Sequence, residues 1–187
     1  MVKLIEYKIR RLINKLKKTN KKYDYYEMTY RLGCTRFNCD TWRENEEWRK
    51  TNKYNGCIYG TPREMKPSIP IGSTIFVLEM HNDENRIKAI GIITKEIIRD
   101  KCYRIYKDGN YNRYVYKGNY RLDIECLSKE NKNIIEKFNM LIFKTKKHIK
   151  RGQGITEIPK WMINELEIDC TEFCVELMSS VHDIKKN

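Results

Sequence analysis

Two β-type segments joined by a turn constrain the fold of this chain more than any other feature. Residues 73–81 read STIFVLEMH and residues 86–94 read RIKAIGIIT, and both are rich in strand-forming Ile, Val or Phe. The sequence NDEN lies between them, and these residue types favour tight turns. Strand-forming segments on either side of a turn predict a β-hairpin. We therefore expect an antiparallel sheet at the centre of the fold.

Three further segments extend this predicted sheet. Residues 102–107 and 111–117 alternate Tyr, Ile and Val with Lys and Arg around the turn sequence DGN, which predicts a second hairpin. Residues 119–127 could add a fifth strand. The alternation indicates a sheet with one buried and one polar face, and such a sheet could close into a barrel.

Helical patterns lie at both ends of the chain. Residues 1–22 carry apolar residues at helical spacing and basic residues on the other faces, which predicts a basic amphipathic helix. Residues 129–150 predict another helix, and residues 158–178 predict a last helical segment. Helices on both sides of a central antiparallel sheet define an α+β domain.

The region before the first hairpin gives weaker signals. Residues 23–32 could form either a short helix or a strand. Residues 33–70 contain several Gly and Pro residues and read as an ordered loop region with short elements. One of these is a helical turn that Asp40 or Thr41 could cap.

The length and hydropathy of the chain favour one folded domain. A chain of 187 residues, of which 40% are hydrophobic, can form one core. We expect the basic helix at residues 1–22 to be followed by a single α+β domain over residues 23–187. Apolar runs such as IFVL are far shorter than the roughly 20 residues of a membrane span. We therefore expect neither a membrane span nor a secretory signal peptide.

Positive charge is concentrated in two segments. The chain holds 38 Lys and Arg against 25 Asp and Glu, a formal net charge of +13. Residues 1–22 and residues 144–151 are basic, whereas residues 152–187 are acidic. This asymmetry suggests a polyanionic partner, an acidic protein partner, or self-association of a basic face with an acidic one.

A nucleic acid, DNA or RNA, is the partner that we expect for the two basic segments. Their Lys and Arg side chains would contact phosphates, and the 13 tyrosines and 3 tryptophans would offer surfaces on which bases stack. Alternatively, the basic side chains of the helix could serve only to keep its outer face in contact with water, and each tryptophan could belong to the core. The phosphate-binding candidates are Arg10, Arg11, Lys15, Lys18, Lys146, Lys147, Lys150 and Arg151.

No motif indicates a catalytic site, a cofactor or a metal. The three histidines stand far apart and in no metal-binding spacing. Two cysteine pairs could together bind zinc, Cys34 with Cys39 and Cys170 with Cys174, but neither has CxxC spacing. The sequence GQG at 152–154 could hold a phosphate with its backbone amides, or it could simply end a helix. We expect a non-catalytic protein without a cofactor, and seven scattered cysteines favour an intracellular location.

The order of features in residues 37–94 provides a resemblance. The segment TRFNCDTWRENEEW is followed by GCIYGTP, by the Pro-bounded turn PSIPIG and by the hairpin. This order resembles the PUA-like superfamily, which includes the EVE, ASCH and YTH modules, although the tryptophan spacing differs from that of YTH modules. The resemblance implies a pocket beside the hairpin that takes a base, often a modified one. Its candidate residues in this sequence are Trp42, Asn45, Trp48, Glu79 and Trp161.

The sequence is also similar to a protein family of large DNA viruses of amoebae, through the segments VLEM, AIGII and RGQGIT. That similarity implies a location in the host cytoplasm or nucleus, with the virion as a further site. We expect a viral nucleic-acid-binding protein. One alternative is a virion-associated structural protein that forms a homodimer through its N-terminal helix and recognises no base. A second alternative is a small enzyme that modifies nucleic acid.

Overall fold

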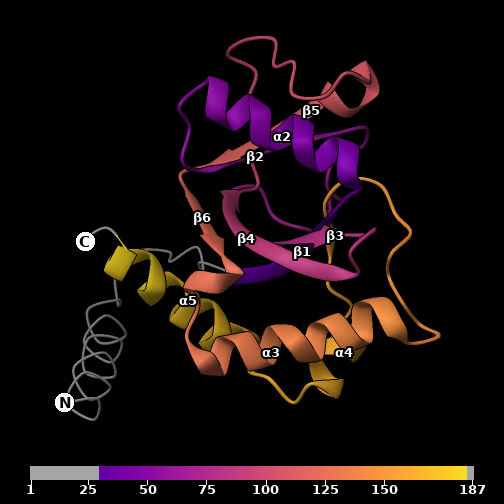
Figure 1. The fold of residues 1–187 in the computed structure, drawn as a ribbon, viewed down its shortest axis with the longest axis vertical. Helices are drawn as coiled ribbons and strands as arrows, with labels where there is room; N and C mark the ends of the chain where they lie inside the picture. Colours follow the sequence, from indigo (N-terminus) through magenta and orange to yellow (C-terminus); the bar gives the residue numbers. More distant parts are fainter. Residues whose placement is uncertain (1–29, 185–187) are drawn as a thin grey trace.

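The structure is a computed structural model that describes residues 30–184 (Figure 1). The predicted basic helix at residues 1–22 lies outside the described residues. The predicted α+β class is confirmed, because helices before and after the central strands accompany the main sheet. Among the described residues, no helix has both the length and the apolar character that a membrane span requires.

The predicted hairpin forms the centre of the main sheet. Strands β3 (Thr74–His81) and β4 (Arg86–Thr94) pair in antiparallel fashion, which confirms the first prediction. Strand β6 (Tyr120–Asp123) extends the sheet beyond β4, within the segment expected to add a strand. Strand β1 (Tyr30–Phe37) pairs with β3, and the two-residue β7 (Thr156–Glu157) pairs with β1. The order of the five strands is β6-β4-β3-β1-β7.

The sheet is mixed rather than antiparallel, because β1 runs parallel to β3. Helix α2 (Cys39–Thr51) and strand β2 (Cys57–Thr61) lie between them in the chain and supply the long connection that parallel strands need. The region expected to be mostly loop therefore holds a central strand and a helix of 13 residues. The sheet is not closed into a barrel, so that part of the expectation was wrong.

The second predicted hairpin does not form. Strand β5 (Tyr114–Gly118) pairs with β2 in a separate two-stranded sheet. Residues 102–107 form no strand, because the Asn112 side chain forms hydrogen bonds with backbone groups of Ile105 and Tyr106 that a strand partner would need. Its Oδ1 accepts from the N–H groups of Ile105 and Tyr106, each at 3.0 Å, and its Nδ2 donates to the Tyr106 carbonyl at 2.7 Å.

The later helices are shorter than predicted. Helix α3 (Lys129–Asn139) continues as a π-helical turn (Met140–Lys144) and ends at Thr145, whose hydroxyl donates to the Leu141 carbonyl at 2.9 Å. Residues 145–150 therefore belong to a loop and not to the predicted helix. The last helical segment is divided into α4 (Lys160–Glu165) and α5 (Cys170–Ile184).

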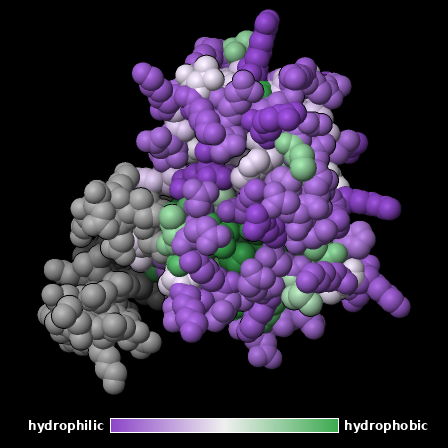
Figure 2. Space-filling view, viewed as in Figure 1, coloured by the Kyte–Doolittle hydropathy of each residue, from purple (hydrophilic) through white to green (hydrophobic). Residues whose placement is uncertain are grey.

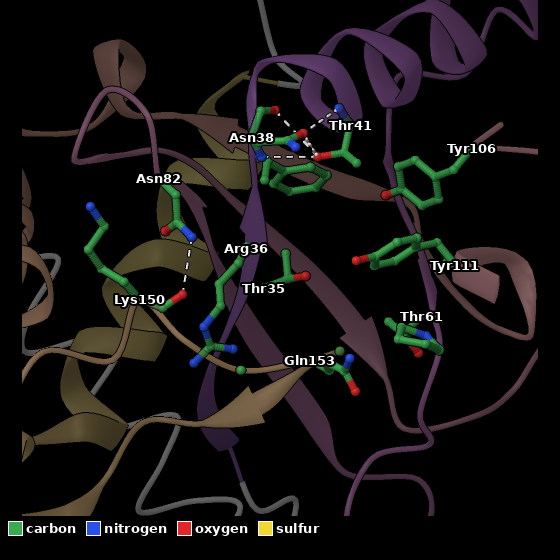
Figure 3. Close-up of a pocket in the computed structure, with 15 residues that line it drawn as sticks. Thr35, Arg36, Asn38, Thr41, Thr61, Asn82, Tyr106, Tyr111, Lys150 and Gln153 are labelled. Carbon is green, nitrogen blue, oxygen red and sulfur yellow. Dashed lines mark hydrogen bonds between the residues drawn. The ribbon is translucent and has the colours of Figure 1, made fainter. Parts of the chain in front are cut away.

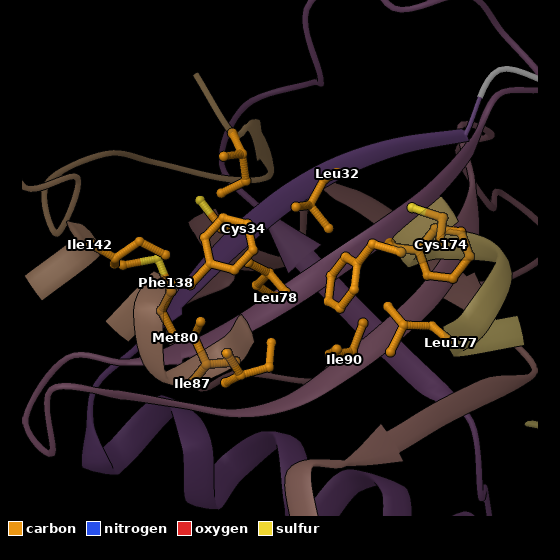
Figure 4. Close-up of a cluster of buried hydrophobic side chains, with 14 of the residues drawn as sticks. Leu32, Cys34, Leu78, Met80, Ile87, Ile90, Phe138, Ile142, Cys174 and Leu177 are labelled. Carbon is orange, nitrogen blue, oxygen red and sulfur yellow. The ribbon is translucent and has the colours of Figure 1, made fainter. Parts of the chain in front are cut away.

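Both faces of the main sheet are buried, which contradicts the expected polar face. The side chains of Phe76, Leu78 and Met80 enter one core, which packs against α3, α4 and α5 (Figure 4). Their neighbours Ile75 and Val77 point to the other face and enter a second core with β2 and β5. Figure 1 shows the same arrangement, with α2, β2 and β5 on one side of the sheet and α3 to α5 on the other.

The close approach of the two sheets requires a glycine at position 91. A Cβ atom there would lie 1.9 Å from Tyr59 Oη and 2.7 Å from the Cys57 side chain. We expect Gly91→Ala to lower the free energy of unfolding by about 1–3 kcal/mol, the usual cost of overpacking. Gly109→Ala is the control, because a Cβ atom at Gly109 would enter open space with no neighbour within 4 Å, and it should change stability by less than about 0.5 kcal/mol. Urea denaturation measures both values, and equal stabilities would contradict this packing.

Candidate functional site: a polar pocket at the end of β1

A pocket with a volume of about 190 Å³ lies at the carboxyl end of β1 (Figure 3). Four other segments complete its walls: the start of α2, the end of β2, the tyrosine-bearing loop before β5, and residues 150–154. Asn82, from the turn of the β3–β4 hairpin, lies at one side. We call this the β1 pocket. Its volume is below the roughly 300–1,000 Å³ of pockets for drug-sized ligands, so it suits a smaller group.

The local sequence explains why β1 ends beside the pocket. Asn38 caps α2 by accepting from the Thr41 N–H at 2.8 Å, and Thr41 Oγ1 in turn accepts from the Asn38 N–H at 3.0 Å. This reciprocal cap stops the strand and starts the helix within one residue. It therefore fixes Asn38 and Thr41 at the rim of the pocket, as Figure 3 shows.

Arg36 attaches the loop after α3 to the wall of the pocket. Its Nε donates to the Ile149 carbonyl at 2.8 Å, and its two terminal nitrogens lie 3.1 Å from Thr156 Oγ1. Gly152 passes so close that a Cβ atom there would lie 2.8 Å from Arg36 Cζ. Among the described residues, no carboxylate forms a salt bridge with Arg36. The guanidinium thus gives this wall a positive charge without an acidic partner.

The charge of the described pocket lining is positive. Arg36 and Lys150 contribute to it, and no Asp or Glu is among the described lining residues. The Lys150 ammonium donates to Asn85 Oδ1 at 2.6 Å and so joins the loop to the hairpin turn. A site with this charge favours an electron-rich or anionic ligand.

Two tyrosines form the opposite wall. The rings of Tyr106 and Tyr111 are 6.0 Å apart in an edge-to-face arrangement, and Figure 3 shows both hydroxyl groups on the pocket side. Burial raises the pKa of Tyr106, so its hydroxyl stays protonated. Its oxygen accepts from Asn45 Nδ2 at 3.1 Å, which leaves its own proton for a ligand. Tyr111 is 37% exposed, so part of its side chain is accessible.

One side chain at the pocket has a buried polar atom without a partner among the described residues. The Asn82 side chain donates from Nδ2 to the Lys150 carbonyl at 3.1 Å, whereas its Oδ1 is buried without a partner there. Buried polar groups are nearly always hydrogen-bonded, so each such exception needs an explanation. Thr35 is only 7% exposed, but its hydroxyl is not one of these buried unpartnered atoms. The Thr35 hydroxyl, by contrast, lies on the pocket side in Figure 3, where a polar ligand would meet it.

The residues expected to form a base pocket do not lie together. Trp42 packs edge-to-face on Phe37 at 5.3 Å and lines a different hollow, and Trp48 lies between Tyr54 and Tyr103. The two tryptophans are six residues apart on α2, a rotation of roughly 240°, so they point in different directions. The expectation of one shared aromatic cage is therefore corrected.

The other three candidates have separate environments. Glu79 is 2% exposed and is bound to Tyr59 and Arg121, so it does not line the β1 pocket. Asn45 is buried behind that pocket, where it also donates to the Ile58 carbonyl at 2.7 Å, and it positions Tyr106. Trp161 is 36% exposed on α4, and Lys147 lies 5.4 Å from its ring centre.

The phosphate-binding candidates are described only in part. Lys150 lines the β1 pocket, and Lys146, Lys147 and Arg151 are exposed on the same loop. The other four candidates lie outside the described residues: Arg10, Arg11, Lys15 and Lys18. Sequence reasoning missed the pocket residues Thr35, Arg36, Asn82, Tyr106 and Tyr111, and its nearby signals were Lys150 and the sequence GQG that follows the basic cluster.

The predicted zinc alternative finds no support in the geometry. Within residues 30–184, no three His, Cys, Asp or Glu side chains lie close enough together to hold a metal ion. Cys34 and Cys174 are fully buried in the helical core, whereas Cys39 is exposed at the start of α2. We find no match to this chain among protein-family models, curated proteins or solved structures.

Proposed function

We propose that this protein binds single-stranded nucleic acid, placing one base in the β1 pocket and the adjoining phosphates on the loop at 144–151. The observation that carries the proposal is the lining of the pocket, where Arg36 and the hydroxyl groups of Tyr106 and Tyr111 stand with no Asp or Glu among the described lining residues. The pocket volume of about 190 Å³ suits one flat ring system rather than a larger ligand.

The polar groups of the pocket match the edge of a base. The Tyr106 hydroxyl supplies a donor, and the Thr35 hydroxyl can act as a donor or as an acceptor. Bases present donors and acceptors side by side on their Watson–Crick edges, which proteins read once the base is unstacked. The accessible part of the Tyr111 side chain gives the base a surface on which to stack.

The basic loop next to the pocket would hold the phosphates. Five of its eight residues are basic: Lys144, Lys146, Lys147, Lys150 and Arg151. Arg36 and Lys150 connect this loop to the pocket wall and to the hairpin turn. Phosphate contacts of this type set the position of the strand and give most of its affinity, whereas the pocket would give the preference for a base.

The PUA-like resemblance supports the same reading. It implies a base pocket beside the hairpin, and the β1 pocket meets the hairpin at Asn82. The pocket walls differ from those that the resemblance suggested, because tyrosines and a threonine replace the expected tryptophans. We keep a PUA-like origin and a viral source as part of the proposal.

Fluorescence anisotropy tests the proposal with labelled single-stranded DNA, single-stranded RNA and duplex DNA. We expect the single strands to bind more tightly than the duplex, with an affinity that falls as salt rises from about 50 to about 200 mM. No binding to any of the three at low salt would overturn the proposal. Equal affinity for all three probes would mean that the protein contacts only phosphates and that no base enters the β1 pocket.

Tyr111→Ala tests the stacking surface. Because stacking on an aromatic side chain contributes about 1–3 kcal/mol per base, this variant should bind single strands roughly 5- to 150-fold more weakly. The salt dependence of binding should stay unchanged, since no charge is removed. Tyr114→Phe is the control, because it removes only a hydroxyl from a tyrosine that is not among the pocket-lining residues. An unchanged affinity of Tyr111→Ala would show that no base stacks there.

A further inference from the structure

Trp161 and the loop at 144–151 form a second surface that the β1 pocket does not include. Among the described residues, the large hydrophobic side chains that are exposed are few: Ile71, Tyr111, Met140 and Trp161. Figure 2 shows a face of the molecule that is hydrophilic over most of its area. Trp161 is 36% exposed, and the Lys147 ammonium lies 5.4 Å from its ring centre.

The same loop reaches both Trp161 and the β1 pocket. Lys147 contacts the indole of α4, and Lys150, three residues later, lines the pocket. Three residues of extended chain span at most about 11 Å, so the two contacts lie within a few nucleotides of each other along a strand. Figure 1 shows the loop rising from the end of α3 past the sheet to the start of α2 and returning to α4.

We propose that Trp161 is a second stacking site, on which a neighbouring base of the same strand rests while the lysines between hold its phosphates. This inference rests on the proposed function and deepens it, because it assigns a second base of the same single strand to a second site. A duplex keeps its bases stacked inside, so it cannot offer a base to Trp161 and another to the pocket at once. Lys147, which lies over the ring, adds a cation beside the stacking surface.

The test compares a labelled thymidine mononucleotide, whose single base cannot occupy both sites, with a labelled oligothymidylate of about 10 nucleotides, which is within the usual site size of 4–16 nucleotides. Trp161→Ala should bind the longer probe about 5- to 150-fold more weakly and the shorter probe with unchanged affinity. Trp161→Phe keeps an aromatic face, so it should retain most of the affinity. The long probe should quench the tryptophan emission of the wild-type protein, and Trp161→Phe should lose that quenching.

The outcomes separate the two proposals. If the wild-type protein binds neither probe at low salt, the proposed function is wrong, and this inference is overturned with it. If both probes bind and Trp161→Ala binds the long one as tightly as wild type, only the second stacking site is overturned. If Trp161→Ala weakens binding of the long probe and Tyr111→Ala does not, the Trp161 site is supported and the pocket is not. Loss of affinity in Trp161→Phe equal to that in Trp161→Ala would also overturn stacking.

Discussion

Replacing Glu79 with alanine should destabilise this fold by about 3–5 kcal/mol, the usual effect of removing one partner of a buried ion pair. Glu79 and Arg121 have side chains that are only 3% and 7% exposed, and their closest nitrogen and oxygen atoms are 2.9 Å apart. The Arg121 Nε lies 3.1 Å from both Glu79 oxygens. Without the Glu79 carboxylate, the Arg121 guanidinium would stay buried and would keep only the exposed Asp123 as an acidic partner.

The same variant would also leave Tyr59 without its acceptor. The Tyr59 hydroxyl donates to Glu79 Oε1 at 2.8 Å, and Tyr59 itself is 1% exposed. A buried hydroxyl that loses its partner adds to the cost of the lost ion pair. Glu79 thus connects the main sheet to the small sheet through Tyr59, which explains a buried acid at the centre of β3.

Asp123→Ala is the matched control for Glu79→Ala. Asp123 accepts from the same guanidinium at 2.6 Å, but its side chain is 60% exposed, so its loss should cost no more than about 1 kcal/mol. Urea denaturation of the two variants measures the difference. If Glu79→Ala were no less stable than Asp123→Ala, the buried ion pair would not be a major contributor to the fold.

The second large effect concerns the basic loop. A variant with Lys146, Lys147 and Arg151 all replaced by glutamine removes three exposed positive charges. Each phosphate contact to a single strand contributes about 0.7 to the slope of log affinity against log salt, so the slope should fall by about 2. The ratio of wild-type to variant affinity should therefore rise roughly twentyfold between about 200 and about 50 mM salt. Fluorescence anisotropy with a single-stranded probe measures both slopes.

An equal change of charge elsewhere provides the control. Lys53, Lys101 and Lys129 are exposed lysines that line neither the β1 pocket nor the basic loop. Their joint replacement by glutamine lowers the net charge by the same amount and should change the slope much less. Identical slopes for the two triple variants would mean that only net charge matters, and that the loop at 144–151 is not the phosphate site.

Local signals predicted the parts of the fold that depend on neighbouring residues. The hairpin of β3 and β4 was found because its two strands and its turn are adjacent in sequence. Strand β1 was not predicted, because it pairs in parallel with β3, which begins 44 residues later in the chain at Thr74. The false second hairpin had the correct alternation, but the Asn112 side chain bonds to the backbone of residues 105–106 and prevents it.

The candidate site could not be predicted from the sequence, because six separate segments assemble it. Thr35 and Arg36 are single polar residues in a strand, and nothing nearby in sequence distinguishes them from other surface residues. The tryptophans of α2 were the more conspicuous residues, yet Trp42 and Trp48 mainly support packing around that helix. The basic cluster was correctly noticed as a feature, but only the structure shows that Lys150 reaches the pocket wall.

The central claim is that a base occupies the β1 pocket. It is tested most directly by comparing two single-stranded probes of equal length and charge, one normal and one without bases, at a fixed salt concentration. The account predicts that the normal probe binds at least about fivefold more tightly, the contribution of one stacked base. It also predicts that Tyr111→Ala largely removes this difference. Equal affinity of the wild-type protein for the two probes would contradict the claim.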